Sequence, residues 1–215
     1  MDENMKNLRK SIIACERCPR LVRYRQSIGE GWRKPVPGFG DVDARLVIIG
    51  PAPSLYGGNR TGRVFTGDKS GDFLFKALYE VGFSNSPVSK DKDDGLKLED
   101  CYITDIVKCS PPDNTPLPLE VKNCSQYINA ELDMLKRKKV ILVLGGLAFS
   151  GVKSYLLSRG AGAKGIKFKH NFAYRLGGII LQCCFHPSPR NTNTHRLEYR
   201  EFVNILLNIK ANYLD

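Results

Sequence analysis

The feature that most constrains the fold is a glycine-rich segment placed directly after a run of strand-forming residues. Residues 45–50 (RLVIIG) are mainly aliphatic, and residues 58–68 (GNRTGRVFTGD) contain three glycines, two arginines, one phenylalanine and one aspartate. A helix-like run begins near Ser70. Open α/β sheets place their ligand sites in the loops that follow the carboxyl ends of strands. The segment therefore predicts both a fold class and a binding site.

The same succession of a short apolar run and a helix-like run recurs three more times. Runs this continuous are typical of strands buried on both faces of a parallel sheet. We therefore expect an α/β fold, a three-layer α/β/α sandwich with a central four-stranded parallel sheet, in a single domain over 1–215. The expected strands are 45–49, 101–107, 140–144 and 179–185; the expected helices are 1–25, 70–82, 118–136, 147–158 and 194–212; and 29–41 and 159–177 are expected to be irregular.

Net charge restricts the class of partner. Lysine and arginine number 33 against 22 aspartates and glutamates, which gives a net charge of +11. Such an excess favours a polyanionic partner, and nucleic acid above all; a solvated lysine-rich surface is the alternative. Several of the basic residues flank the loops that follow the expected strands, which favours the first interpretation. These are Arg60, Arg63, Lys69, Arg190 and Arg196.

The sequence also bears on location. It contains no run of about 18 apolar residues, so no membrane span is expected. Residues 1–6 (MDENMK) are polar and partly acidic, unlike a secretory signal. We expect a cytoplasmic protein.

The seven cysteines are an odd number, which in such a protein argues against a disulfide framework. Cys15 and Cys18 form a C-x-x-C pair, Cys109 follows an expected strand, and Cys124 lies early in a helix that Pro118 could open. These four thiolates could converge on one iron-sulfur cluster. A four-cysteine zinc site and four unrelated buried thiols are the alternatives. The other three, Cys101, Cys183 and Cys184, are expected to be core residues.

A second loop, HPSPRN at 186–191, follows the last expected strand. With the segments above it resembles the uracil-DNA glycosylase superfamily, and most closely its family five (type B), found in thermophilic prokaryotes. The resemblance spans nearly the whole chain, and the order and spacing of its segments make it specific. The segments are CxxCPRL at 15–21, PVPGFG at 35–40, GPAP at 50–53, GNRTGRVFTGD at 58–68, KCSPP at 108–112 and HPSPRN at 186–191.

The resemblance implies a monofunctional DNA repair enzyme from a thermophile. Such an enzyme flips uracil, and other deaminated bases, out of DNA and hydrolyses the N-glycosidic bond, leaving an abasic site. It implies a nucleoid-associated monomer acting on double- or single-stranded DNA, and no segment identifies a protein partner such as a sliding clamp. It also implies a 4Fe-4S cluster on Cys15, Cys18, Cys109 and Cys124, with residues 1–40 contributing part of the cluster site.

The resemblance further assigns roles to residues. Each has a structural alternative: Asp68 could only cap a helix, Phe65 could be core, His186 could be structural, and Asn114 could be a turn residue. The implied catalytic residues are Asp68, His186 and Asn114; the implied substrate-binding residues are Phe65, Asn191, Gly50 and Ala52; and the implied DNA contacts are Arg60, Arg63, Arg190 and Arg196.

The sequence departs from the pattern of many relatives at two places. The segment 50–54 carries no carboxylate or amide, which shifts the catalytic role to Asp68. Asp105 stands where many relatives have an asparagine that reads the edge of uracil, and this matters only if its side chain faces the pocket.

Two other functions compete with the glycosylase. One is a non-catalytic iron-sulfur damage sensor that binds nucleic acid. The other is an α/β phosphate-binding hydrolase, which the absence of a G-x-x-x-x-G-K-[ST] segment disfavours.

Overall fold

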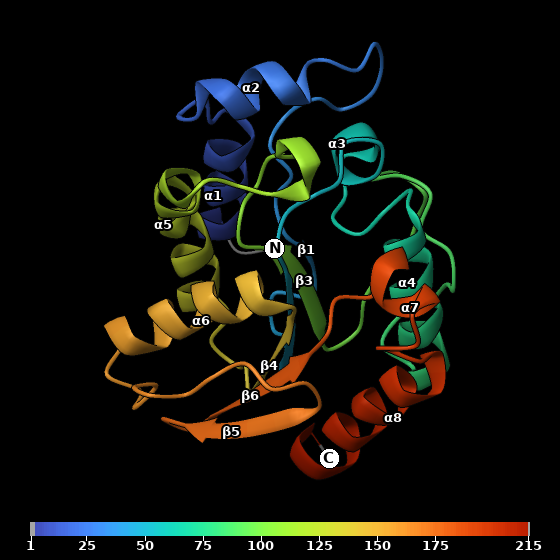
Figure 1. The fold of residues 1–215 in the computed structure, drawn as a ribbon, viewed down its shortest axis with the longest axis vertical. Helices are drawn as coiled ribbons and strands as arrows, with labels where there is room; N and C mark the ends of the chain where they lie inside the picture. The colour runs from blue at the N-terminus through green and yellow to red at the C-terminus, as the bar shows by residue number, and fades with distance from the viewer. Residues whose placement is uncertain (1–2, 215) are drawn as a thin grey trace.

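The computed structural model describes residues 3–214 and places their strands in a single sheet (Figure 1). Its strand order is β1-β3-β2-β4-β6-β5. The four expected strands form its centre as the parallel series β3-β2-β4-β6, while β1 and β5 pair antiparallel at the two edges. The strands are β1 (Phe39–Gly40), β2 (Leu46–Gly50), β3 (Cys101–Asp105), β4 (Val140–Leu144), β5 (Phe172–Leu176) and β6 (Ile179–Cys184).

The expected sheet of four strands is therefore corrected to a mixed sheet of six. β1 contains only two residues, too few to show periodicity, in a segment expected to be irregular. β5 joins β6 through Gly177 and Gly178, which have φ values of 55° and 82°. Two consecutive residues with positive φ form the type of two-residue turn that suits a β-hairpin, and Gly-Gly is one of its sequence signals. This signal was the available clue to β5.

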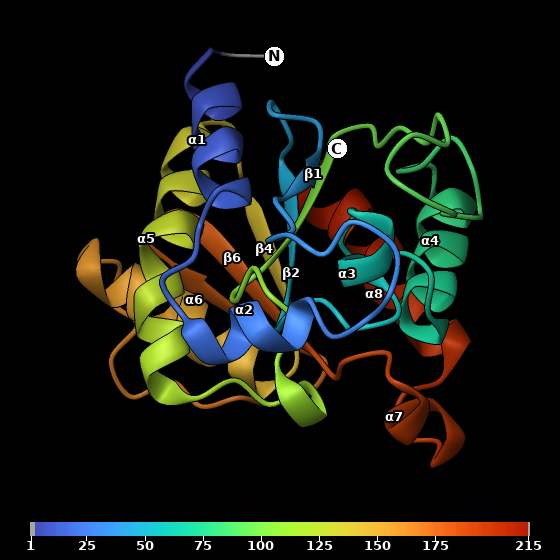
Figure 2. The ribbon, with the colours of Figure 1, turned by 90° about the horizontal axis from the view of Figure 1, so that it is seen from above.

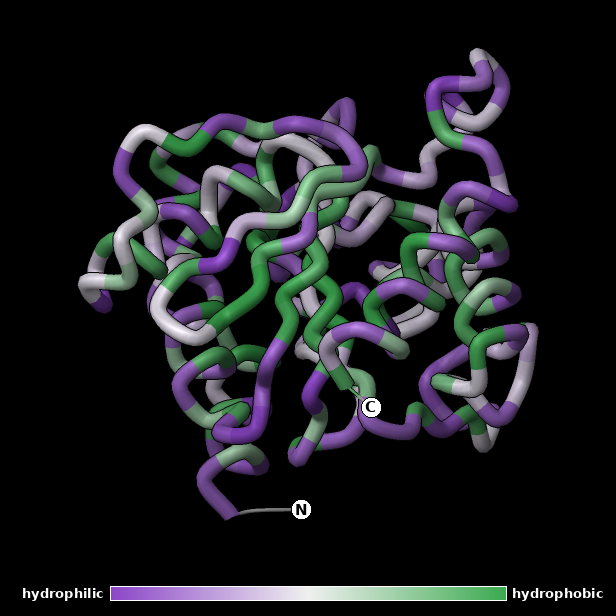
Figure 3. The backbone as a smooth tube through the Cα atoms, turned by 90° about the horizontal axis from the view of Figure 1, so that it is seen from below, coloured by the Kyte–Doolittle hydropathy of each residue, from purple (hydrophilic) through white to green (hydrophobic). Residues whose placement is uncertain are grey.

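Alternate residues of the central strands pack on opposite faces of the sheet. Ile48 belongs to a core beneath α4 (Lys69–Val81) and α8 (Tyr199–Ile209). Val47 and Ile49 belong to a second core beneath α1 (Glu3–Ile13), α5 (Pro118–Met134) and α6 (Gly146–Ser158). Figures 1 and 2 show these two helix layers on either side of the sheet, and Figure 3 shows the hydrophobic tube running through the strands between them. The three-layer α/β/α architecture is confirmed.

The helix expected over 1–25, which carries or precedes the C-x-x-C pair, is divided in two. Within the described residues it folds as α1 and α2 (Pro19–Arg25), and the connection between them carries the C-x-x-C pair; positions 1 and 2 lie outside the described residues. Arg20 donates from Nε and Nη2 to the two carboxylate oxygens of Glu120, at 2.8 and 2.7 Å. This bidentate pair fixes α2 against the start of α5.

The C-terminal helix begins later than expected, at Tyr199 rather than near 194. Residues Pro189–Asn193 form a separate short helix, α7, and Lys210–Leu214 form the final turns, η2. Two further short elements, α3 (Gly58–Thr61) and η1 (Pro112–Asn114), lie in loops at the carboxyl edge of the sheet. None of the helices in residues 3–214 is long and apolar enough to cross a membrane.

Candidate active site

A cavity of about 400 Å³ lies at the carboxyl edge of β2, β3 and β6. Both glycine- and proline-rich loops contribute to it, as expected from the sequence. Its walls come from five separate segments, which parallel strand pairing brings to one edge. They are Pro51, Ala52, Pro53, Ser54, Phe65, Asp68, Lys69, Ser70, Asp105, Asn114, His186, Ser188 and Pro189.

Asp68 has two roles at once. It is the N-cap of α4, and its Oδ1 accepts a hydrogen bond from the backbone N–H of Gly71 at 2.9 Å. Its side chain also lines the cavity. The capping alternative is therefore true of this residue without excluding a chemical role, because each carboxylate oxygen has lone pairs for a second donor.

Ser54 is a polar residue of the site that the sequence did not reveal. Its hydroxyl donates to Oδ2 of Asp68 and accepts a hydrogen bond from the backbone N–H of Gly57 at 3.1 Å. Both carboxylate oxygens of Asp68 are thus held by donors. The only sequence signal was a serine just after the Gly50–Pro53 segment, which is too common a residue type to be informative.

Phe65 and His186 face each other in the cavity. Their ring centroids are 5.5 Å apart, and the ring planes differ by 25°. Phe65 has a φ of 52°, an unfavourable conformation for a large side chain, and only 7% of its surface is exposed. Strain of this kind is retained where the surroundings fix a residue, often at a functional site.

His186 is a neutral imidazole at physiological pH. Burial lowers its pKa to about 4, and the carboxylate of Asp68 opposes the shift only in part. A neutral imidazole still carries one N–H and can donate a hydrogen bond from it. Gly145, with a φ of 97°, lies beside the Cβ of His186 where the loops after β4 and β6 meet.

Asn191 does not line this cavity. Its Nδ2 donates to the backbone carbonyl of His186 at 2.8 Å, which holds the loop in place. It lies instead in a neighbouring hollow with Arg190 and Arg196. Asn191 therefore positions the His186 loop, and its role in binding substrate stays a prediction.

Gly50 and Asp105 are opposite each other at the carboxyl ends of β2 and β3. A Cβ at Gly50 would lie 2.3 Å from Oδ1 of Asp105 and 2.6 Å from the ring of Phe65, so only glycine fits. Gly50 therefore shapes the floor of the cavity, which Ala52 also lines. The orientation that the sequence left open is resolved: the side chain of Asp105 faces the cavity.

Asn114 lies on the rim of the cavity. It is exposed, and both it and Asp113 have positive φ values, 53° and 54°. Asn114 therefore has the turn conformation that the sequence suggested, and it also lies at the cavity.

Three of the four arginines expected to contact DNA, Arg60, Arg190 and Arg196, are exposed. Arg63 is not: only 3% of its surface is exposed, and its Nη1 pairs with Oδ1 of Asp94 at 2.8 Å. Its guanidinium also lies over the ring of Phe39, 4.4 Å from the centroid. Arg63 is thus a structural residue, because loop 89–95 covers it from solvent.

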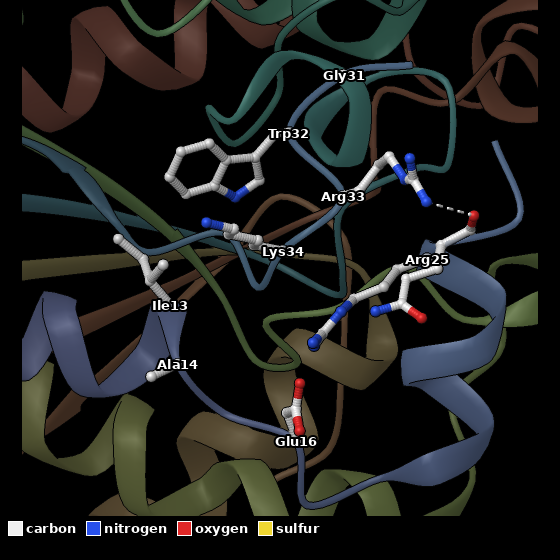
Figure 4. Close-up of a pocket in the computed structure, with 9 residues that line it drawn as sticks. Ile13, Ala14, Glu16, Arg25, Gly31, Trp32, Arg33 and Lys34 are labelled. Atoms are coloured by element: carbon white, nitrogen blue, oxygen red, sulfur yellow. Dashed lines mark hydrogen bonds between the residues drawn. The ribbon is translucent and has the colours of Figure 1, made fainter. Parts of the chain in front are cut away.

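A second, more open cavity of about 510 Å³ lies between the end of α1 and the loop after α2. Figure 4 shows Trp32, Arg33 and Lys34 on one side of it and Glu16 on the other, with Arg25 reaching in. The backbone N–H of Trp32 donates to the carbonyl of Arg60 at 2.9 Å, which ties this loop to α3. Basic and aromatic side chains gathered in one hollow are typical of nucleic-acid contacts.

The four cysteines expected to share a cofactor line one small pocket between α2, the end of β3 and α5. Several N–H groups donate to their sulfurs: Nη1 of Arg25 to Cys109 at 3.2 Å, the backbone N–H of Lys108 to Cys124 at 3.4 Å, and Nδ2 of Asn123 to Cys18 at 3.5 Å. Cys101, Cys183 and Cys184 are buried elsewhere, in the sheet, as expected.

The contacts of Arg25 indicate what kind of group the cysteine pocket could hold. Only 3% of its surface is exposed, and its guanidinium donates to Cys109 and to the carbonyl of Cys15 rather than to a carboxylate. Its buried Nε has no hydrogen-bond partner within residues 3–214. A buried cation needs a compensating negative charge, and thiolates around an anionic group would supply one.

Across the described part of the chain, no three His, Cys, Asp or Glu side chains are grouped to hold one metal ion. The iron-sulfur cluster and the four-cysteine zinc site both stay predictions from the sequence.

Comparison with known proteins bears on the same site. A family model described as the uracil DNA glycosylase superfamily matches residues 37–210. A Type-5 uracil-DNA glycosylase of Pyrobaculum aerophilum is 41% identical over 209 residues, covering 94% of this chain and 90% of that protein. The Type-5 uracil-DNA glycosylase of Thermus thermophilus is 39% identical over 211 residues, 94% of each.

More distant relatives carry a different type number. A Type-4 uracil-DNA glycosylase of Thermotoga maritima is 30% identical over 189 residues, covering 87% of this chain and 83% of that protein. The two Type-5 relatives above match over more of the chain and at higher identity than this one. With its α/β/α fold and its cavity at the carboxyl edge of the sheet, this chain belongs to the uracil DNA glycosylase superfamily.

Proposed function

We propose that this protein is a DNA repair enzyme that excises uracil from DNA by hydrolysing the N-glycosidic bond. The observation that carries the proposal is one cavity in which a carboxylate, Asp68, and a neutral imidazole, His186, line the same space as the ring of Phe65. Breaking this bond leaves positive charge on the sugar and negative charge on the base. The cavity holds a group suited to each.

His186 serves the base side of the reaction. As the bond breaks, negative charge collects on the oxygens of uracil, and the N–H of a neutral imidazole donates to one of them. A preorganised donor of this kind is typically worth about 10²–10³ in rate. Because Asn191 holds the carbonyl of His186, the ring needs little reorganisation during the reaction.

Asp68 serves the sugar side. Its carboxylate offsets positive charge on the oxocarbenium-like sugar and orients the attacking water. Both oxygens are held by donors from Ser54 and Gly71, so the group is fixed in place before substrate arrives. Asn114 on the exposed rim supplies a further amide for the water or the base.

The base must leave the helix to reach this cavity, because the glycosidic bond is inaccessible in stacked DNA. Phe65 then supplies an apolar face for stacking. The exposed Arg60, Arg190 and Arg196 contact phosphates or the gap left in the stack. The basic hollow around Trp32 extends this surface beyond α3.

We also propose that Cys15, Cys18, Cys109 and Cys124 hold a 4Fe-4S cluster. The support is the shared pocket, the N–H donors on three sulfurs and the buried Arg25 cation. The cluster, when bound, supplies a covalent anchor between α2, the end of β3 and α5. These residues are separate from those that line the active cavity, so the cluster stabilises the fold without a step in bond cleavage.

The test is excision itself. A duplex with one uracil is incubated with the protein, then heated with alkali, and strand breaks are mapped. Breaks at uracil that require alkali support a monofunctional glycosylase, and a thymine duplex is the matched control. Tight binding without breaks would instead favour the damage sensor.

A further inference from the structure

A histidine outside the active cavity binds the backbone of the residue directly before His186. Nδ1 of His170 accepts a hydrogen bond from the backbone N–H of Phe185 at 3.1 Å. The rings of His170 and Phe185 also stack, with centroids 4.3 Å apart and planes that differ by 24°. His170 therefore contacts Phe185 through both its backbone and its ring, although it is not among the residues that line the cavity.

The pairing of β5 with β6 explains why these two residues meet. Phe172 is opposite Cys183 in the last pair of this antiparallel ladder, and β6 ends at Cys184. Partners in an antiparallel ladder move in opposite directions along the two strands. The same register carried two residues further brings His170 opposite Phe185. The N–H of Phe185 thus lies just beyond the end of the ladder, and an imidazole is its acceptor.

Glu201 on α8 fixes which nitrogen of this imidazole carries the proton. A ring that accepts a hydrogen bond at Nδ1 has its N–H at Nε2. Nε2 of His170 lies 3.0 Å from Oε1 of Glu201, so it donates to this carboxylate. A hydrogen bond at one ring nitrogen sets the role of the other. Side-chain exposures of 17% for His170 and 35% for Glu201 show that the pair is largely covered.

His186 is therefore held along the chain on both sides. Before it, His170 fixes the backbone of Phe185. After it, Asn191 donates from Nδ2 to the carbonyl of His186 at 2.8 Å. The backbone carries the imidazole of His186, so a displaced Phe185 would move that ring away from its place beside Phe65. A misplacement of about 1 Å in a reacting site can cost about 10² in rate.

We propose that His170 is a positioning residue for His186. By binding the N–H of Phe185 and stacking on its ring, it fixes where the imidazole of His186 meets the departing base. The inference rests on the proposed function, in which His186 donates to that base. Because His170 does not line the cavity, its effect on the rate passes through His186. This requirement separates positioning from general support of the fold.

Three variants isolate the hydrogen bond. His170→Leu removes the acceptor. His170→Asn keeps one, because the amide oxygen is bonded to Cγ as Nδ1 is. Tyr174→Phe is the matched control: it removes the bond from the Tyr174 hydroxyl to the carbonyl of Lys167, 2.6 Å long, in the same segment. Single-turnover excision, binding to a duplex with an uncleavable uracil analogue, and melting temperature are measured for each.

We expect His170→Leu to lose at least about tenfold in rate while duplex binding changes by less than about twofold. His170→Asn should stay within about threefold of wild type, and Tyr174→Phe should affect melting alone. Added to His186→Ala, His170→Leu should cost less than about twofold more, because the residue it acts through is absent. Full rate in folded His170→Leu, an equal loss in His170→Asn, or a loss that adds in full to that of His186→Ala overturns the proposal.

Heteronuclear NMR of wild-type protein keeps the test decisive if His170→Leu does not fold. The ring of His170 should be the Nε2–H tautomer, and the N–H of Phe185 should be protected from hydrogen exchange. The Nδ1–H tautomer, or a Phe185 N–H that exchanges as fast as an exposed amide, overturns the proposal.

The same spectra separate this proposal from the proposed function. If wild-type protein does not excise uracil, the proposed function fails by itself. The ring signals of His186 then still report positioning: they should shift in His170→Leu and not in Tyr174→Phe. An unmoved His186 ring in folded His170→Leu overturns the inference whether or not the protein excises uracil.

Discussion

Ser54 donates a hydrogen bond from its hydroxyl to Oδ2 of Asp68, from a segment fourteen residues away in the chain. The opposite oxygen of Asp68 accepts from the backbone of Gly71. The carboxylate is therefore held between the loop after β2 and the first turn of α4. The orientation of Asp68 therefore depends on the loop after β2 as well as on its own helix.

Removing the hydroxyl should loosen the carboxylate. We expect Ser54→Ala to lower the single-turnover rate by about tenfold, on the scale of a hydrogen bond to a charged group, with little change in DNA binding. Ser54→Thr keeps a hydroxyl and should recover most of the rate. Equal losses in both variants would mean that packing, not the hydrogen bond, matters at this position.

Two substitutions distinguish the capping role of Asp68 from its catalytic role. Asn caps helices about as well as Asp, so Asp68→Asn should melt like wild type while losing about 10² in rate. Asp68→Ala should lose the rate and also about 1 kcal/mol of stability. If Asp68→Asn keeps nearly full rate, the residue is only a cap.

The depressed pKa of His186 predicts a pH-dependent stability. In the folded protein the ring binds a proton only near pH 4, whereas in the unfolded chain it does so near its ordinary pKa of 6.5. Between these values the unfolded state binds more protons, so the free energy of unfolding falls as pH falls through that window. Urea denaturation of wild type and His186→Gln over this range measures it; the variant should lose part of the slope.

The two arginines of the glycine-rich loop should behave differently. Arg60→Ala should weaken DNA binding and reduce the log–log salt slope by about 0.9, the share of one phosphate contact. Arg63→Ala should leave the slope unchanged but cost about 2 kcal/mol of stability, because it removes a buried guanidinium that binds Asp94 and Ser89 and packs over the ring of Phe39. The converse result would place Arg63, not Arg60, at the DNA.

The cysteine pocket predicts a protein that is brown when purified without oxygen, with iron and sulfide in equal amounts. Cys18→Ser should lower the iron content and the melting temperature before it lowers the rate of the folded fraction, since the pocket and the active cavity have different linings. Cys101→Ser, at a cysteine outside the pocket, is the control for iron content. Colourless wild-type protein with stoichiometric zinc would contradict the cluster.

The central elements were predictable because short-range patterns determine them. Apolar runs predicted the four parallel strands, and Asp68 ahead of a helical run predicted the start of α4. The same short-range patterns did not predict the edge strand β1 or the division of the N-terminal segment. β1 is too short to have a period, and the segment over 1–25 is broken into two helices by the loop that carries Cys15 and Cys18.

The sequence by itself determined which residue types stand at the carboxyl edge of the sheet, since loops that follow parallel strands must meet there. Only the tertiary structure decided what each does. Burial against loop 89–95 shields Arg63 from solvent, and strand register turned Asp105 into the cavity opposite Gly50. Burial and register depend on contacts between segments far apart in the chain, which no local pattern records.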